Sequence, residues 1–147
     1  MALFYAGNIK GILSRMPDDI EKLKELGKNE PVASFLGMKL LELSPGFASV
    51  SMAMKPEYIN FNGMIFGGII SAVADQAFAY ATNSVVNPNV AAQFNIHFIA
   101  AAGEKDELTA ECRVLKSSKR VCVSEIKVIN QAGKLIATAT GTTIPLA

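Results

Sequence analysis

The sequence is poor in the residues that build metal and disulfide sites. It contains one histidine and two cysteines, Cys112 and Cys122, and the cysteine spacing matches no zinc or redox motif. We therefore expect no metal site and no resident cofactor. We interpret the two cysteines as reduced residues of a cytoplasmic protein, with a single cross-strand disulfide as the alternative.

Two further absences narrow the class of protein. The net charge is only +1, from 14 basic and 13 acidic residues, so there is no general basic surface for a nucleic acid. No uncharged apolar run reaches the ~18 to 20 residues of a membrane span, because Asp75 interrupts the longest one, and no secretory signal is recognisable at the N-terminus. Hydrophobic residues nevertheless make up 50% of the chain. This content favours a buried oligomer interface.

The apolar periodicity predicts one α+β domain over residues 1–147, with a helical extension over about residues 1–30. Short connections between consecutive strands imply antiparallel pairing. The long helix is apolar almost all round, so the sheet must cover one side of it and another surface the other. Strands are expected over 38–43, 47–54, 91–100, 107–116, 120–130 and 134–143, and helices over 17–26 and about 67–83.

The glycine pair Gly67-Gly68 and the carboxylate of Asp75 are the informative features of the long helix. A charge in so apolar a segment is costly to bury without compensation. Asp75 lies eight residues after Gly67, or about 12 Å along a helix, which is too far for both to act on one small group. If the helix packs antiparallel against its copy across a two-fold axis, Asp75 of one subunit approaches the helix start of the other. The spacing therefore predicts an oligomer.

Attack on a carbonyl is the chemistry that fits these groups. Free N–H groups at a helix start hold a developing oxyanion, and the carboxylate activates water or attacks directly. Structural roles are the alternative, and spacing alone does not decide between them. The glycines would then serve a tight turn or close packing, and Asp75 would be bonded to a neighbouring group.

A family resemblance rests on the same segment. Asn60, Gly63, Gly67, Gly68 and Asp75 resemble, in type and order, a motif of hotdog-fold acyl-CoA thioesterases. The sequence that follows, Ala-Asp-Gln-Ala-Phe-Ala-Tyr-Ala-Thr-Asn-Ser, is similar to the PaaI-like, phenylacetic acid degradation-type branch. The resemblance covers about residues 31–145. It implies an antiparallel sheet wrapped around one central helix, an acyl-CoA substrate, and a homodimer or dimer of dimers with sites between subunits.

The resemblance also implies roles for particular residues. Asp75 matches the nucleophile or general base, and the amide of Gly67 matches the oxyanion donor, supported by Gly68. Asn60 matches a residue that orients water or the carboxylate. The turn that contains Ser118, Lys119 and Arg120 resembles one near the nucleotide of coenzyme A, with a solvated hairpin turn as the alternative.

Two positions depart from the family pattern. Phe66 stands where a histidine usually precedes the glycine pair, and phenylalanine cannot make the hydrogen bonds of imidazole. Ala91 replaces a serine that some relatives carry on the strand after the helix. A backbone oxyanion site survives both changes. They point to slower hydrolysis, or to a different way of holding the acyl group.

Three functions follow from these residues. The first is hydrolysis of a small or medium, or aromatic, acyl-CoA, with Phe66 and Phe78 beside the acyl group; core packing is their alternative role. The second is non-catalytic binding of acyl-CoA or another apolar ligand, which Phe66 motivates. The third is a hydratase or dehydratase, for which His97 is the only histidine to pair with a carboxylate.

Overall fold

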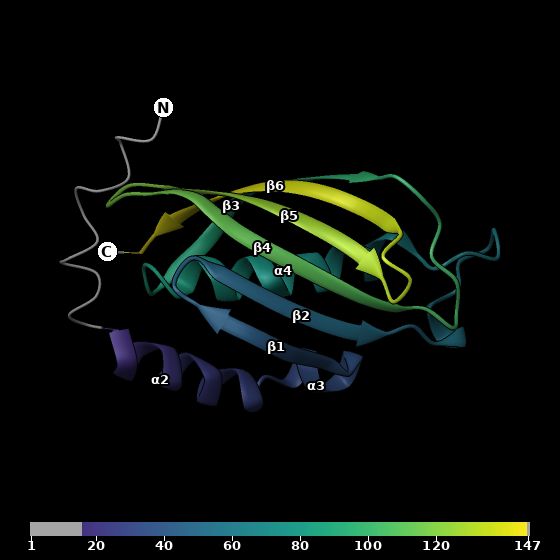
Figure 1. Ribbon diagram of the computed structural model, residues 1–147, viewed down its shortest axis with the longest axis horizontal. Coiled ribbons are helices and arrows are strands. Elements are labelled where there is room, and N and C mark those ends of the chain that lie inside the picture. The colour runs from purple at the N-terminus through teal and green to yellow at the C-terminus, as the bar shows by residue number, and fades with distance from the viewer. Residues whose placement is uncertain (1–15, 147) are drawn as a thin grey trace.

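A curved sheet of antiparallel strands wraps around one long helix in the computed structural model, which describes residues 16–146 (Figure 1). The sheet order is β1-β2-β4-β5-β6-β3, and every pairing is antiparallel. The predicted α+β class is confirmed; residues 1–15 of the predicted extension lie outside the described part of the chain. The elements are α2 Met16–Lys28, α3 Pro31–Leu36, β1 Met38–Ser44, β2 Phe47–Ala53, the 3-10 turn η1 Pro56–Tyr58, α4 Gly67–Asn83, β3 Asn89–Phe98, β4 Glu107–Ser117, β5 Cys122–Asn130 and β6 Leu135–Pro145.

Helix α4 begins and ends where the sequence predicts. It starts at Gly67, after Phe66 in an extended conformation. At its end, the hydroxyls of Thr82 and Ser84 donate hydrogen bonds to the carbonyls of Phe78 and Ala81. Its sheet-facing side is buried, whereas the opposite side is open in the single chain. The open face carries the exposed residues Gly68, Asp75 and Ala79, with the half-buried Ala72 between them.

The core lies between α4 and the inner face of the sheet. Val50 and Met52 of β2 are buried there, which confirms a core role for the methionine stripe of this strand. Phe78 of α4 lies so close to Gly141 of β6 that a Cβ on the glycine would be 2.4 Å from the ring. Burying a side chain of this size stabilises the fold by about 2 to 3 kcal/mol. Any substitution at Gly141 would therefore displace this ring.

Strand β3 is shifted as a whole by two residues from its predicted bounds. It covers Asn89–Phe98 instead of 91–100. The strand starts early because the side-chain carbonyl of Asn83 accepts a hydrogen bond from the Asn89 amide at 2.9 Å. It ends early because the amides of Ile99 and Ala100 both donate to the carbonyl of Ile136. These are tertiary contacts, which local periodicity does not report.

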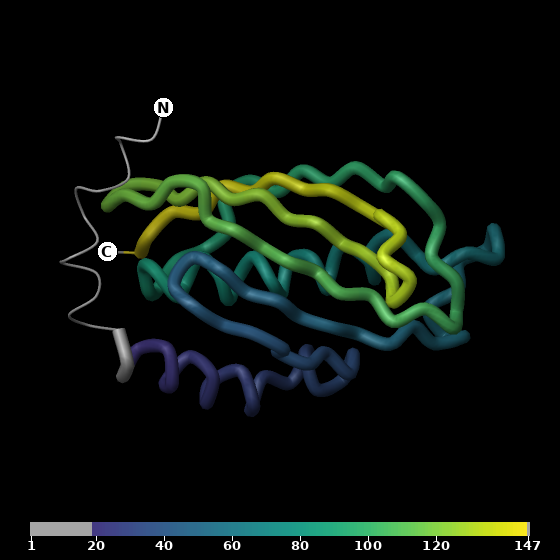
Figure 2. The backbone as a smooth tube through the Cα atoms, in the orientation of Figure 1, coloured from purple at the N-terminus to yellow at the C-terminus, as the bar shows by residue number. Residues whose placement is uncertain are grey.

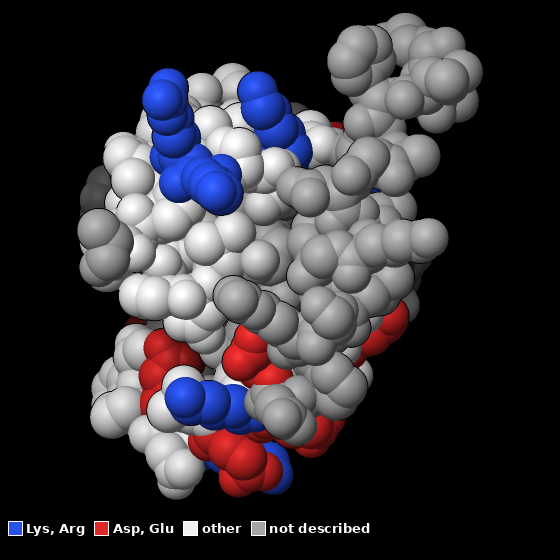
Figure 3. Space-filling model, turned by 90° about the vertical axis from the view of Figure 1, so that its left-hand side faces the viewer, with Lys and Arg blue, Asp and Glu red and all other residues white. Residues whose placement is uncertain are grey.

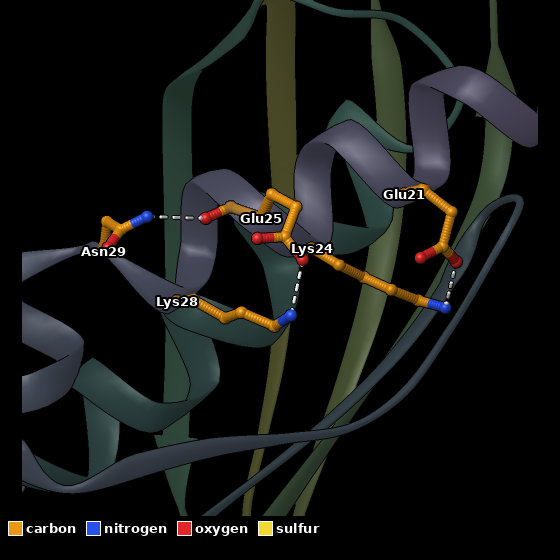
Figure 4. A network of polar contacts seen from close by, with 5 residues as sticks. All are labelled: Glu21, Lys24, Glu25, Lys28 and Asn29. Carbon is orange, nitrogen blue, oxygen red and sulfur yellow. Dashed lines mark hydrogen bonds and ion pairs between the residues drawn. The ribbon is translucent and has the colours of Figure 1, made fainter.

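The N-terminal helices lie along β1, at the sheet edge away from β3 (Figure 2). On α2, Lys24 pairs with Glu21 at 2.7 Å and Lys28 pairs with Glu25 (Figure 4). Pairs as exposed as these are screened by solvent and contribute little to stability. Cys112 and Cys122 are buried and are not bonded to each other. Cys112 lies opposite Ile126 and Cys122 lies opposite Ser117, so the two cysteines are not cross-strand neighbours. None of the helices within residues 16–146 is long and apolar enough to cross a membrane.

Candidate active site

The start of α4 presents two unpaired backbone amides. The amides of Ile69 and Ile70 both donate to the carbonyl of Phe66, at 2.9 and 3.4 Å. Within residues 16–146, the amides of Gly67 and Gly68 make no hydrogen bond. Free amides at the positive end of a 17-residue helix form an anion-binding position. The amide of Gly67, which the sequence singled out as an oxyanion donor, is therefore an unpaired donor at a helix N-terminus.

Two aromatic rings cover the glycine pair. A Cβ on Gly67 would lie 3.0 Å from the ring of Phe98, and a Cβ on Gly68 would lie 2.4 Å from the ring of Phe66. Both rings are about half exposed, at 52% and 57%. The glycines thus also serve close packing, which was the alternative role. Phe98 was missed by the sequence interpretation, and its inward position on a strand was the only available signal.

A surface hollow of about 560 Å³ lies in front of this helix start. It brings together three of the residues that the sequence singled out, Asn60, Phe66 and Gly67. Its other lining residues come from η1, the following turn and the first turn of α4: Glu57, Tyr58, Ile59, Phe61 and Ile69. The hollow is large enough for part of a small-molecule ligand.

Asn60 organises the turn that leads into α4. Its side-chain oxygen accepts hydrogen bonds from the amides of Asn62 at 2.9 Å and Met64 at 3.3 Å, and its carbonyl accepts one from Gly63. Gly63 has a φ of +76°, a left-handed conformation that favours glycine. The Asn60 side-chain amide has no partner in the described part of the chain. It remains available to donate to a water or a carboxylate.

Asp75 lies at the midpoint of α4, on its open face. Its carboxylate is exposed and has no hydrogen-bond or ion-pair partner among residues 16–146. The expectation of a carboxylate held away from water is therefore wrong for the single chain, as is the alternative of a structural bond. The surrounding apolar helix surface still removes part of its hydration, and together with the charge of Glu30 this raises the pKa of Asp75.

One chain does not bring the whole set of predicted residues together. Asp75 does not line the hollow at Gly67. The turn with Ser118, Lys119 and Arg120 follows β4, whose end lies at the opposite end of α4: the Val114 amide donates to Gly46, whose own amide donates to Ser84. At 1.5 Å per residue, about 25 Å of helix separates that end from Gly67. Figure 3 shows Lys and Arg side chains gathered over the end of the molecule that carries this turn.

Three other candidates are placed by their burial and strand faces. Phe78 is 1% exposed and packs against Phe94 with ring centroids 5.8 Å apart, so we assign it to the core and no longer to the acyl site. His97 is on the outer face of the sheet, opposite Thr138 of β6, and the sheet separates it from Asp75. The hydratase hypothesis therefore loses its acid–base pair. Ala91 lies on β3 and contributes no hydroxyl.

Comparisons with known proteins agree with this geometry. The family model of the thioesterase superfamily matches residues 62–137, which include the start of α4 and Asp75. A putative esterase of Archaeoglobus fulgidus is 36% identical, over 84% of this chain and 80% of its own. The acyl-coenzyme A thioesterase PaaI of Escherichia coli is 34% identical, over 75% of this chain and 79% of its own.

Solved structures give the same result. The structure of E. coli PaaI superposes with a TM-score of 0.84 at 29% identity, covering 88% of this chain and 95% of PaaI. The TT0310 protein of Thermus thermophilus has a TM-score of 0.77 at 32% identity, covering 80% and 99%. The chain therefore belongs to the thioesterase superfamily, as a PaaI-like protein with the hotdog fold.

Proposed function

We propose that this protein is an acyl-CoA thioesterase, which converts an acyl-CoA and water to a carboxylic acid and free coenzyme A. The observation that carries the proposal is the combination, on one helix, of unpaired amides at its start and an unpaired exposed carboxylate at its midpoint. The named activity of the E. coli relative supports it. The amides suit the oxyanion and the carboxylate suits the attack on a thioester carbonyl.

The site requires a second copy of the chain, because Gly67 and Asp75 are too far apart along one helix. Strand β3 supplies the edge at which two copies can meet: it pairs only with β6 among the described strands, and it exposes Val90 and Phe98. A long apolar edge strand without a cover is prone to pair with another chain. Two copies joined antiparallel at β3 would continue one sheet and place their α4 helices side by side. We therefore propose a homodimer as the active unit.

The position of the two-fold axis follows from the spacing. Gly67 of one copy meets Asp75 of the other only if the axis passes near Ser71, halfway between them. Ser71 is half-buried beside the open face, next to Ala72, and residues of this size let two helices approach closely. In this arrangement the C-terminal end of the second copy's α4 extends beyond Gly67 of the first copy. Its basic turn then reaches the end of the molecule that holds the hollow, where it can meet the phosphates of coenzyme A.

Disulfide trapping tests this axis. An Ala72→Cys variant places the two thiols close to the axis, about 3 Å apart along the helix direction. If the two helices pack about 8–10 Å apart, the two Cα atoms come within the range of a disulfide. We expect a covalent dimer on oxidation, seen by non-reducing electrophoresis. An Ala79→Cys variant is the matched control, because its two copies lie about 24 Å apart along the helices. Equal trapping of both variants would contradict the proposed axis.

The reaction at this interface uses few groups. The thioester oxygen accepts hydrogen bonds from the amide of Gly67, with Gly68 and the helix dipole in support. Asp75 of the second copy either takes a proton from the attacking water or attacks the carbonyl carbon itself, in which case water then hydrolyses the anhydride. The carbon–sulfur bond breaks and the thiolate leaves to take up a proton. Asn60 lines the hollow, and its free side-chain amide can orient the water.

Thiol release from a panel of acyl-CoAs tests the function directly. We expect release from octanoyl-CoA or phenylacetyl-CoA above the rate without protein, measured with a thiol-reactive dye. The second candidate function is binding without hydrolysis, and the observation that favours it is Phe66 in place of a histidine. Calorimetric binding of octanoyl-CoA without thiol release from any member of the panel would select that function.

A further inference from the structure

A cavity of about 700 Å³ lies between the N-terminal helices and strand β1. Its floor is the inner face of the sheet, and one wall is the flank of α4. This volume is in the range of small-molecule sites, and neither the amide at Gly67 nor the hollow in front of it belongs to this cavity. The residues used below are Ala33, Met38, Leu40, Val50, Gln76 and Tyr80.

The cavity exists because α2 is held above β1 at its C-terminal end. Gly27 lies directly on Tyr80, since a Cβ there would be 1.8 Å from the phenol oxygen. The side-chain amide of Gln76 donates to Glu30, at the junction of α2 and α3, at 2.5 Å. Leu40 faces inward opposite the fully buried Val50, yet it remains only half-buried. An inward-facing leucine without full packing marks space that an apolar group can fill.

The chemistry of the walls selects an uncharged occupant. Met38, Leu40, Val50 and Ala33 supply an apolar floor. Lys24 and Lys28 also line the cavity, but their ammonium groups are paired with Glu21 and Glu25 (Figure 4). Only their aliphatic stems are therefore left for the cavity. Lys39 and Glu42 line it as well, and they are exposed side chains of opposite charge on β1. The polar groups of the α4 wall, on Gln76 and Tyr80, interact with each other and with Glu30.

The cavity adjoins the proposed reaction centre. Gln76, which forms part of its wall, is the residue directly after Asp75 on α4. Glu30, which anchors the wall through Gln76, is close enough for its charge to act on Asp75. An acyl group whose carbonyl is held beside Asp75 can thus continue along the α4 flank toward Tyr80. The coenzyme A part then extends away from this cavity, toward the hollow at Gly67 of the second copy.

We propose that the cavity between α2 and β1 receives the acyl group of the thioester, so that the N-terminal helix pair sets the acyl length that the protein accepts. The class of acyl group is an uncharged medium-length chain or a single aromatic ring. This inference rests on the proposed thioesterase function and names a second, separate part of that site.

Substitutions at Leu40 test the cavity. Leu40→Trp fills it, and we expect the ratio of kcat/KM for octanoyl-CoA to kcat/KM for acetyl-CoA to fall at least about tenfold, since a filled pocket rejects the longer chain. Leu40→Ala enlarges it and should move the preferred chain toward longer acyl groups. Leu26→Trp is the matched control, because Leu26 is 59% exposed on α2 and does not line the cavity. Its ratio should stay within about twofold of the unaltered protein.

The outcomes separate this inference from the proposed function. An unchanged chain-length profile in Leu40→Trp and Leu40→Ala would overturn the cavity and leave the thioesterase intact; if Leu40→Trp does not fold, Leu40→Ala decides alone. If the unaltered protein releases no thiol from any acyl-CoA, the proposed thioesterase function is contradicted. The cavity is then tested by calorimetry, which compares the affinities for octanoyl-CoA and free coenzyme A. An affinity gain from the acyl chain that Leu40→Trp removes would still support the cavity. Equal affinities for the two ligands would overturn it.

Discussion

Replacing Asp75 with asparagine should abolish thioester hydrolysis while the protein stays folded. The amide keeps the size of the side chain but can neither take a proton from water nor attack a carbonyl. General-base or nucleophilic roles of this kind are worth about 10³-fold or more in kcat. The measurement is thiol release from the best acyl-CoA of the panel under saturating substrate. Asp75→Asn with more than a tenth of the original kcat would remove Asp75 from the mechanism.

The stability of this variant distinguishes a catalytic from a structural carboxylate. The fold raises the pKa of Asp75, first through partial burial and then through the charge of Glu30. The folded chain thus binds a proton more tightly than the unfolded chain, and stability falls as the pH rises from the unfolded pKa through the folded one. At pH 7 the ionised carboxylate is a cost that asparagine removes. The thermal midpoint of Asp75→Asn should equal or exceed that of the original protein at pH 7.

The matched control for Asp75→Asn is Glu125→Gln. Glu125 is an exposed carboxylate on the outer face of β5, in a different surface hollow from Gly67. It loses a charge in the same way, so a general effect of net charge would appear in both variants. We expect Glu125→Gln to keep its thiol-release activity. A lower thermal midpoint for Asp75→Asn alone would instead show that the carboxylate has a structural partner in the assembled protein.

The start of α4 could be predicted from the sequence because its signals are local. A glycine pair after an extended residue, followed by 15 further helical residues without proline, defines the helix from its own composition. The alternation of β2, β4 and β5 is local as well, and these strands have nearly their predicted bounds. The fold was therefore accessible from periodicity, and the family motif supplied the wrapping of the sheet around the helix.

The surroundings of the site could not be predicted, because they depend on contacts between distant segments. Phe78 and Phe98 are both aromatic, but contacts between distant segments decide their burial: Phe78 packs against Phe94 of β3 and Gly141 of β6 and is 1% exposed, whereas Phe98 at the end of β3 is 52% exposed. The cavity under α2 depends on the distance that Gly27 and Tyr80 set between two helices far apart in the chain. Asp75 is exposed because the face of α4 opposite the sheet has no cover within one chain.

Replacing Gly67 with proline should lower kcat by about 10² to 10³-fold, the usual effect of removing one oxyanion donor. The substitution deletes the candidate amide and little else. Gly67 is the first residue of α4, a position that suits proline, and Phe66 already has the extended conformation, φ −59° and ψ 129°, that a residue before proline adopts. The new Cβ lies 3.0 Å from the ring of Phe98, which is half exposed and can shift.

Gly67→Ala is the control that makes this result specific. It adds the same Cβ beside Phe98 but keeps the backbone N–H, so it should keep most of the activity. A large loss in Gly67→Ala would show that packing against Phe98, and not the amide, controls the rate. Full activity in Gly67→Pro would show that another group donates to the oxyanion, and the unpaired amide of Gly68 would be the next candidate.

Mixed dimers of the two inactive variants then decide whether the site lies between subunits. In a dimer of one Asp75→Asn and one Gly67→Pro chain, one interface site loses both groups and the other keeps an intact Gly67 and an intact Asp75. We expect such dimers, isolated through two different tags, to recover about half of the original activity, because symmetry provides two equivalent sites. If both groups acted within one chain, every site would carry one lesion and no activity would return. That outcome would require Gly67 and Asp75 to meet within a single chain, which about 12 Å of straight helix between them does not allow.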